Sequence, residues 1–155
     1  MTSTDTRIDP LRSLATDVAL ADQFTRVFER AEKRQVWLMF LDNEHRLTGP
    51  LMPMDELPTE PDEPCSTEDL GVVRFAKVLV ERARMVAEFV GAHQYLWMWE
   101  RRGSGTLSHR DRRWAAAISE ESGLRPGAGG APAPLRAQLL LHDDGARLIT
   151  PDDLD

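Results

Sequence analysis

Residues 97–117 read WMWERRGSGTLSHRDRRWAAA, and this stretch decides the fold that we expect for the chain. It contains the end of an apolar run, a turn rich in glycine and serine, and then a helical pattern. Ser108 and Asp111 have the spacing of a capping box, in which two side chains satisfy free N–H groups at the start of a helix. An acid in the first turn also complements the positive end of the helix dipole. The stretch therefore predicts a strand, a turn and a helix in succession.

The segments on either side alternate between helical and strand patterns. Apolar residues at three- and four-residue steps predict helices at residues 10–34, 67–90 and 108–122. We expect Thr67 or Ser66 to cap the second helix, so that Gly71 lies inside it. Short apolar runs predict strands at residues 35–41, 46–54, 94–99, 135–141 and 146–149. The order α-β-β-α-β-α-β-β indicates the α/β class, with a mixed central sheet flanked by helices.

The strand at residues 94–99 is expected at the centre of the sheet. Successive side chains of a strand point to opposite faces, so Trp97 and Trp99 share one face while Leu96 and Met98 share the other. Both faces are apolar, which is typical of a strand covered by helices on both sides. The strand at residues 46–54 contains two prolines instead, and prolines confine a strand to the edge of a sheet.

The length of 155 residues is enough for one domain with one ordinary core. We expect a flexible tail at residues 1–10 and a single domain at residues 11–155. Two loops should interrupt this domain, an acidic, proline-rich loop at residues 55–66 and a loop rich in glycine and proline at residues 123–134.

The composition narrows the classes of protein to consider. Hydrophobic residues make up 41% and charged residues 29%, a balance typical of a folded globular chain. No apolar run is long enough to span a bilayer and the N-terminus lacks the pattern of a signal peptide, so we expect a cytoplasmic protein with no membrane partner. The single cysteine, Cys65, excludes an internal disulfide and a thiolate-rich zinc site. A net charge of −7 disfavours nonspecific binding of nucleic acid by the whole surface.

The order of elements, with a Gly-Ser-Gly turn at residues 103–105 and then Ser108-x-x-Asp111, resembles the JAB/MPN family, and within it the RadC-like branch. The fold that this resemblance implies is a cytidine-deaminase-like three-layer sandwich. In that family a strand ends in His-x-His-Pro-Ser-Gly, and a Ser-x-x-Asp motif starts the next helix. The two histidines and the aspartate hold zinc, a glutamate near an earlier strand is the general base, and the serine assists the oxyanion. The resemblance covers about residues 30–150 in outline and is specific only around residues 95–117.

The chain departs from the family pattern at the metal ligands. The two histidine positions fall within residues 98–102, where there is no histidine. Arg34 and Gln35 stand where the resemblance places the catalytic glutamate. A catalytic zinc needs three protein ligands and one open position, which Asp111 alone does not provide, and neighbouring arginines would repel the dication. The resemblance therefore implies a degenerate member with no cofactor, no metal and no catalytic residue, in which Ser108 and Asp111 are vestigial.

A displaced metal site is the alternative that would make the protein an enzyme. The four histidines share no ligand spacing, and His109 is the one that lies near the motif. A site rebuilt from Glu100, His109 and Asp111 would support a metal-dependent hydrolase of the isopeptidase or amidase type. A two-residue offset on a helix points His109 away from Asp111, which weighs against this alternative.

Arginines gather around the motif of an otherwise acidic chain: Arg101, Arg102, Arg110, Arg112 and Arg113. One interpretation is a solvated face in which the arginines pair with nearby acids. Another is a site for an anion or an acidic peptide, because the N-terminus of the following helix already attracts negative charge. The same cluster also leaves nucleic acid open as a ligand, although no recognised module supports it.

The first functional hypothesis is a catalytically inactive JAB/MPN-like scaffold that binds another protein or an acidic peptide. The predicted binding residues are Arg101, Arg102, Gly103, Ser104, His109, Arg112 and Arg113. Two alternatives stay open: the hydrolase with a rebuilt metal site, and a RadC-like factor associated with nucleic acid, which rests on analogy alone. The sequence does not select an oligomeric state.

Overall fold

The computed structural model describes residues 11–123 and 133–154. Within them a five-stranded sheet has the order β2-β1-β5-β6-β7. The strands are β1 (Gln35–Leu41), β2 (Leu47–Met54), β5 (Gln94–Glu100), β6 (Leu135–His142) and β7 (Gly145–Leu148). β5 and β6 run parallel and the other neighbours run antiparallel, so the sheet is mixed, as expected. The predicted tail at residues 1–10 and most of the predicted loop at residues 123–134 lie outside the described residues.

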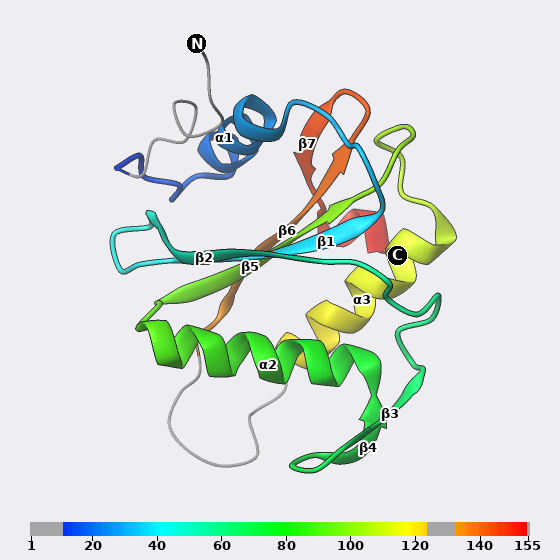
Figure 1. The fold of residues 1–155 in the computed structure, drawn as a ribbon. Coiled ribbons are helices and arrows are strands. Elements are labelled where there is room, and N and C mark those ends of the chain that lie inside the picture. The colour runs from blue at the N-terminus through cyan, green and yellow to red at the C-terminus, as the bar shows by residue number, and fades with distance from the viewer. Residues whose placement is uncertain (1–10, 124–132, 155) are drawn as a thin grey trace.

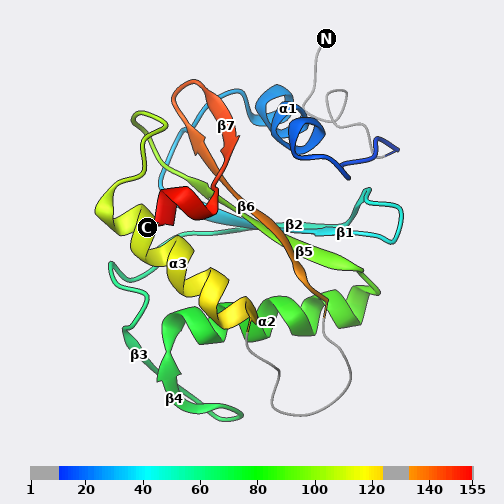
Figure 2. The same ribbon diagram turned by 180° about the vertical axis from the view of Figure 1, so that it is seen from behind.

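Helices cover both faces of this sheet. α1 (Asp17–Phe28) lies on one face, and α2 (Phe75–Val90) and α3 (His109–Gly123) lie together on the other (Figure 1). The view from behind shows the same arrangement, with α3 crossing α2 (Figure 2). The predicted α/β class with a mixed sheet between helices is therefore confirmed. No helix among residues 11–123 and 133–154 is long and apolar enough to cross a membrane.

β5 contributes side chains to two separate cores. Trp97 and Trp99 pack with α2 and α3, whereas Leu96 and Met98 pack with α1 on the other face. This is the alternation that the sequence predicted, and it follows from the two-residue period of a strand. The prediction for β2 is also confirmed, because this strand lies at an edge of the sheet.

The prediction of a helix that starts at Thr67 is wrong. Residues 64–74 instead form a separate hairpin of β3 (Pro64–Thr67) and β4 (Gly71–Arg74), and α2 begins only at Phe75. Thr67 Oγ1 accepts a hydrogen bond from Leu70 N at 2.9 Å and donates one to Gly71 O at 3.0 Å, so Thr67 closes a turn and caps no helix. Gly71 has a φ of 75°, a left-handed conformation that glycine adopts readily and that a helix interior does not contain. The predicted loop at residues 55–66 is shorter for the same reason.

The first predicted helix is also shorter than expected. α1 begins after Thr16, whose side chain accepts a hydrogen bond from Ala19 N, and it ends at Phe28. Glu29 follows with a φ of 65°, which stops the helix and turns the chain toward β1. α3 begins at His109, directly after its cap Ser108, as the capping box predicted. A short 3-10 helix, η2 (Pro151–Leu154), closes the described chain.

Candidate functional site

The end of β5 places two neighbouring charged residues on opposite faces of the sheet. Alternation along the strand continues from Trp99 into Glu100 and Arg101. Glu100 therefore faces the layer of α1, and Arg101 faces α3. Both side chains are buried, with 4% of Glu100 and 7% of Arg101 exposed. A buried charge must be paired or hydrogen-bonded, and the two residues achieve this with different partners.

Arg101 forms an ion pair with Asp111 inside the protein. Arg101 Nε and Nη2 both donate to Asp111 Oδ2, at 3.0 and 2.9 Å, and the two side chains are 8% and 5% exposed. The same guanidinium donates to the carbonyl oxygens of Ser104 at 2.5 Å and of Thr106 at 2.9 Å. Arg101 thus holds the turn after β5 against the start of α3.

Asp111 also caps its own helix. Ser108 N donates to Asp111 Oδ2 at 2.9 Å, and Asp111 N donates to Ser108 Oγ at 3.1 Å, which completes the predicted capping box. Burial by itself would raise the pKa of Asp111, but the hydrogen bonds from Ser108 and the charge of Arg101 outweigh it and lower the pKa. The carboxylate is therefore ionised, and its Oδ2 is held by Arg101 and Ser108.

Glu100 is engaged in the same way on the other face. Its two carboxylate oxygens accept hydrogen bonds from Glu32 N at 2.7 Å, Lys33 N at 3.2 Å, Gln35 Nε2 at 2.7 Å and Trp37 Nε1 at 2.9 Å. Burial would raise the pKa of Glu100, yet these donors lower it. Glu100 thus fastens the segment before β1 to the end of β5.

The residues around Asp111 do not fit the zinc that the family resemblance implies. Asp111 Oδ2, the oxygen bonded to Arg101, already accepts three hydrogen bonds, and a guanidinium cannot ligate a metal because it has no free lone pair. Glu100 and Asp111 are bonded to different partners, Glu100 to the segment before β1 and Asp111 to Arg101, and His109 lies on a different side of α3 from Asp111. In the part of the chain that the structure describes, no group of three or more His, Cys, Asp or Glu side chains is placed to hold a metal ion.

The predicted binding residues do not form one patch. Arg101 is buried, whereas Arg102 is 73% exposed in its side chain and pairs with Asp143 at 3.3 Å. Gly103 and Ser104 lie in the turn that Arg101 holds.

The helical members of the predicted set lie on the far side of α3. His109, Arg112 and Arg113 line a shallow polar depression, together with Arg74 and Glu120. Arg113 pairs there with Glu60 at 2.8 Å and with Asp62 at 3.0 Å. Arg102 and Arg113 therefore pair with acids at the surface, which is the first of the two interpretations of the arginine cluster.

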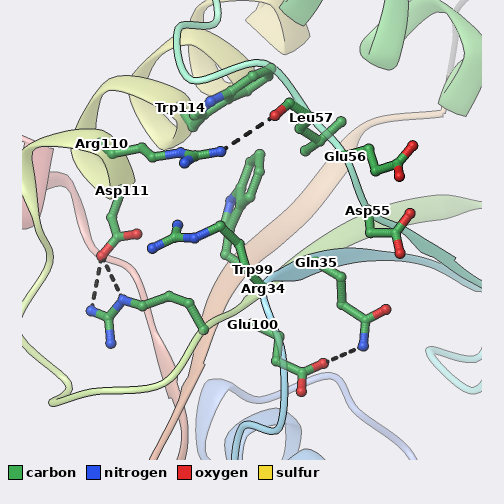
Figure 3. Close-up of a pocket in the computed structure, with 11 residues that line it drawn as sticks. Arg34, Gln35, Asp55, Glu56, Leu57, Trp99, Glu100, Arg110, Asp111 and Trp114 are labelled. Carbon is green, nitrogen blue, oxygen red and sulfur yellow. Dashed lines mark hydrogen bonds and ion pairs between the residues drawn. The ribbon is translucent and has the colours of Figure 1, made fainter.

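A pocket lies on the near side of α3, where the chain enters β1 and leaves β5 (Figure 3). It encloses about 120 Å³. Its lining residues are Arg34, Gln35, Asp55, Glu56, Leu57, Trp99, Glu100, Arg101, Arg110, Asp111 and Trp114. The Trp99 and Trp114 rings pack 5.6 Å apart and form an aromatic wall. Their indole N–H groups bond elsewhere, to Gln138 Oε1 and to Pro58 O, so the wall presents carbon to the pocket.

Neither Arg34 nor Arg110 was among the predicted binding residues, although Arg110 was counted in the arginine cluster. Arg34 is exposed at the mouth and Arg110 is half-buried, and both guanidinium groups point into the space between the loop at Leu57 and α3 (Figure 3). One sequence signal could have found Arg110, because the four-residue step from Arg110 to Trp114 puts both on one face of α3. The structure places Arg34 beside the end of β5 through the pairing of Gln35 with Glu100.

No protein-family model matches this chain, and no curated protein is significantly similar to it. Its function is therefore argued from two features of the structure. One is the buried pair of Arg101 and Asp111, and the other is the pocket beside it.

Proposed function

We propose that this chain is a JAB/MPN-like scaffold of the RadC-like kind that has lost its hydrolytic zinc site and acts by binding a segment of another protein. The observation that carries the proposal is the Arg101 guanidinium, which sits on Asp111 Oδ2 inside the protein. Asp111 is the residue that matches the zinc ligand of the family motif. In this chain an internal cation supplies the positive charge that the carboxylate needs.

The chemistry of arginine supports a role without hydrolysis. A guanidinium stays protonated at any ordinary pH, donates hydrogen bonds only and cannot polarise a carbonyl as a Lewis acid does. Arg34 stands where the resemblance places the general base, and an arginine cannot take a proton from water. Both halves of the hydrolytic machinery are thus replaced by cations.

The pocket supports a role in binding. Ligand sites are typically concave and mostly apolar, with a few polar groups that fix orientation. Trp99, Trp114 and Leu57 supply the apolar part here, and Arg34 and Arg110 supply the polar part. The loop that carries Leu57 is held over α3, because Arg110 and Trp114 both donate to carbonyl oxygens of residues 57 and 58, at 3.4 and 3.2 Å.

Neither alternative function has an observation in its favour. A rebuilt metal site would need Glu100, His109 and Asp111 within reach of one ion, but His109 lies on a different side of α3 from the two acids, and each acid is bonded to the protein. A nucleic-acid factor would need a continuous basic surface, and Arg102 and Arg113 are paired with acids instead. The binding scaffold is therefore the function that the geometry supports best.

The first test is the metal content of the purified, tag-free protein by elemental mass spectrometry, combined with thermal melting with and without a chelator. We expect no stoichiometric zinc and an unchanged melting temperature. One zinc per chain together with a melting temperature that the chelator lowers would overturn the proposal. An Asp111→Asn variant serves as the matched control, because a site at Asp111 would lose its metal in that variant.

The second test addresses binding. Partners captured by the wild-type protein are compared with those captured by Arg110→Glu, which reverses a charge inside the pocket, and by Arg102→Glu, which reverses one outside it. We expect Arg110→Glu to lose the partner and Arg102→Glu to retain it. Equal capture by all three proteins would show that the pocket is not the binding surface.

A further inference from the structure

The pocket contains two arginines that no carboxylate of the described residues pairs with. Within residues 11–123 and 133–154, Arg34 makes no hydrogen bond and no ion pair, and Arg110 makes one long bond, to Leu57 O at 3.4 Å. The two guanidinium groups act on each other as like charges. Burial and then the nearby Arg34 cation lower the pKa of Arg110, and the carboxylates of Asp111 and Glu60 only partly oppose this.

The inner carboxylates of the pocket are already satisfied. Asp111 is paired with Arg101, so together these two side chains contribute no net charge. Glu100 lines the pocket as well, but its carboxylate accepts four hydrogen bonds from the segment at residues 32–37 on the other face. Neither acid forms an ion pair with Arg34 or Arg110, although Glu100 keeps its negative charge because its four donors are neutral.

The carboxylates at the rim are placed around a different cation. Asp55 pairs with Lys33 at 2.8 Å, and Glu56 also acts on Lys33. Lys33 with its two acids leaves one negative charge at the rim, and Glu100 adds a second, so in sum these charges balance the two positive charges of Arg34 and Arg110. The two arginines are nevertheless the cations of the site that no acid in the described part of the chain pairs with, so their donors are available to an anion.

The apolar wall defines the rest of the ligand. Trp99 and Trp114 lie beside Arg34 and Arg110 on the same side of the pocket (Figure 3). An anion held by the two arginines would therefore carry an apolar group directly next to its charge. An aromatic group suits this wall best, because tilted and offset ring pairs add to the stabilisation from burial.

We propose that this pocket binds a carboxylate attached to an apolar group, with Arg34 and Arg110 as donors to the carboxylate and Trp99 and Trp114 as the surface for the apolar part. The inference rests on the proposed function, since it names the ligand chemistry of the same site. Arginine suits a carboxylate because its planar fork matches the two oxygens. A phosphate dianion fits less well, because it has no apolar part for the Trp99 and Trp114 wall and its second negative charge would face the acids at the rim.

This chemistry has three sources, which simple probes distinguish. N-acetyl-phenylalanine carries the carboxylate of a polypeptide C-terminus, and its amide is the neutral control. N-acetyl-phenylalanyl-glutamic acid α-amide, with a blocked C-terminus and a free γ-carboxyl group, offers only an acidic side chain. 3-Phenylpropionate represents a small carboxylic acid with no peptide group, and inorganic phosphate represents a dianion with no apolar part.

The experiment is an NMR titration that follows the indole N–H signals of the four tryptophans. Trp99 and Trp114 line the pocket, whereas Trp97 lies outside it and serves as the internal reference; the indole N–H of Trp37 also lies outside but is bonded to Glu100 at the pocket. We expect the free acid of N-acetyl-phenylalanine to shift the first two signals and the amide to leave all four unchanged. Affinities for the other two carboxylates then show which source the pocket prefers.

Substitutions test the two arginines. Arg34→Gln and Arg110→Gln should each weaken carboxylate binding by about tenfold or more, since each removes a charge-assisted hydrogen bond. Arg102→Gln is the matched control, because it removes the same charge from a side chain that is 73% exposed and outside the pocket. Arg34 has no partner within the described residues, so its replacement leaves the fold intact.

Several results would overturn this inference. In the titration, these are equal affinities for N-acetyl-phenylalanine and its amide, a higher affinity for phosphate than for any carboxylate, or no shift with any probe. Among the variants, it is a loss of affinity in Arg102→Gln as large as in Arg34→Gln and Arg110→Gln. These results do not bear on the metal test. If the protein is metal-free and captures a partner through Arg110 but binds no carboxylate, the proposed function stands and the carboxylate inference is wrong. If the protein contains stoichiometric zinc, the proposed function is wrong whatever the titration shows.

Discussion

Arg101, at the end of β5, differs in what it bonds from the pair of Arg34, just before β1, and Arg110, in the first turn of α3. Arg101 directs its donors to Asp111 and to the carbonyl oxygens of the turn, including those of Ser104 and Thr106. Arg34 and Arg110 share a pocket, yet no carboxylate of the described residues pairs with either of them.

This difference separates a structural cation from one that is available to a ligand. A buried charge whose hydrogen bonds are all made to the protein holds its surroundings in place, and removing it leaves its partner uncompensated. A half-exposed charge without a partner contributes little to stability and keeps its donors for a ligand. Substitution of Arg101 should therefore lower stability, whereas substitution of Arg34 or Arg110 should weaken ligand binding and leave stability nearly unchanged.

The largest effect is expected for Arg101→Ala. The variant leaves the buried Asp111 carboxylate without its counter-ion and frees the turn, which should lower the free energy of unfolding by about 3–5 kcal/mol. Chemical denaturation of both proteins measures this difference. Arg102→Ala removes the adjacent, exposed arginine and should change stability by at most about 0.5 kcal/mol. A similar loss in both variants would contradict the structural role of Arg101.

Asp111→Asn should have the next largest effect, about 2 kcal/mol. A residue that only caps a helix would tolerate asparagine, because a side-chain acceptor remains. The ion pair with Arg101 makes the difference, since asparagine leaves a buried guanidinium without an opposite charge. Equilibrium unfolding decides between the two roles: a variant as stable as the wild type would mean that the ion pair contributes nothing.

The same carboxylate predicts a pH dependence. The pKa of Asp111 is lower in the folded protein than its usual value of 3.8, and that of Glu100 is lower than 4.5. Each acid therefore contributes stability that is fully present above these values and is lost as the pH falls through the lower, folded pKa. Unfolding measured between roughly pH 6 and pH 2 should show a loss of stability below about pH 4.5. The loss should be smaller in Asp111→Asn, which has only Glu100 left of the two.

Ser108→Ala tests the cap without changing Arg101, Arg34 or Arg110. It removes the acceptor for Asp111 N and should cost about 1 kcal/mol, while the pair of Arg101 and Asp111 stays in place. Thermal melting and helix content by circular dichroism measure the effect. A loss as large as that of Arg101→Ala would mean that the turn depends on the cap more than on the ion pair.

The smallest effect on stability is expected for Arg34→Gln. It removes one of two like charges in the pocket, so stability should stay the same or rise by at most about 0.5 kcal/mol. Denaturation at low and high salt measures it, because screening should reduce any gain. A marked loss of stability would place Arg34 with Arg101 as a structural residue.

The regular part of the fold was predictable because its signals are local. The limits of β1 and the alternation of Trp97 and Trp99 against Leu96 and Met98 agree with the structure. The start of α2 was not predictable in the same way. Val72 and Val73 fit the apolar period of a helix as well as a strand, and the left-handed backbone at Gly71 decided between them.

The candidate site was predictable only in part. The capping box of Ser108 and Asp111 depends on three residues of one helix turn, and its spacing is visible in the sequence. The arginines near it looked like one cluster, because neighbours in sequence were taken as neighbours in space. The period of the strand turned Arg101 inward, and the period of α3 put Arg110 on one side and Arg112 and Arg113 on the other.

The sequence by itself determined the α/β class, the two-sided burial of β5 and the cap of α3, since each of these depends on periods and spacings within a short segment. Only the tertiary structure decided which charges are satisfied. The ion pair of Arg101 with Asp111 spans 10 residues, and the bonds from the segment before β1 to Glu100 span 63 to 68 residues. Charges act through space over distances that only folding sets, so the same arginine is structural when folding brings a carboxylate to it and is available to a ligand when folding does not.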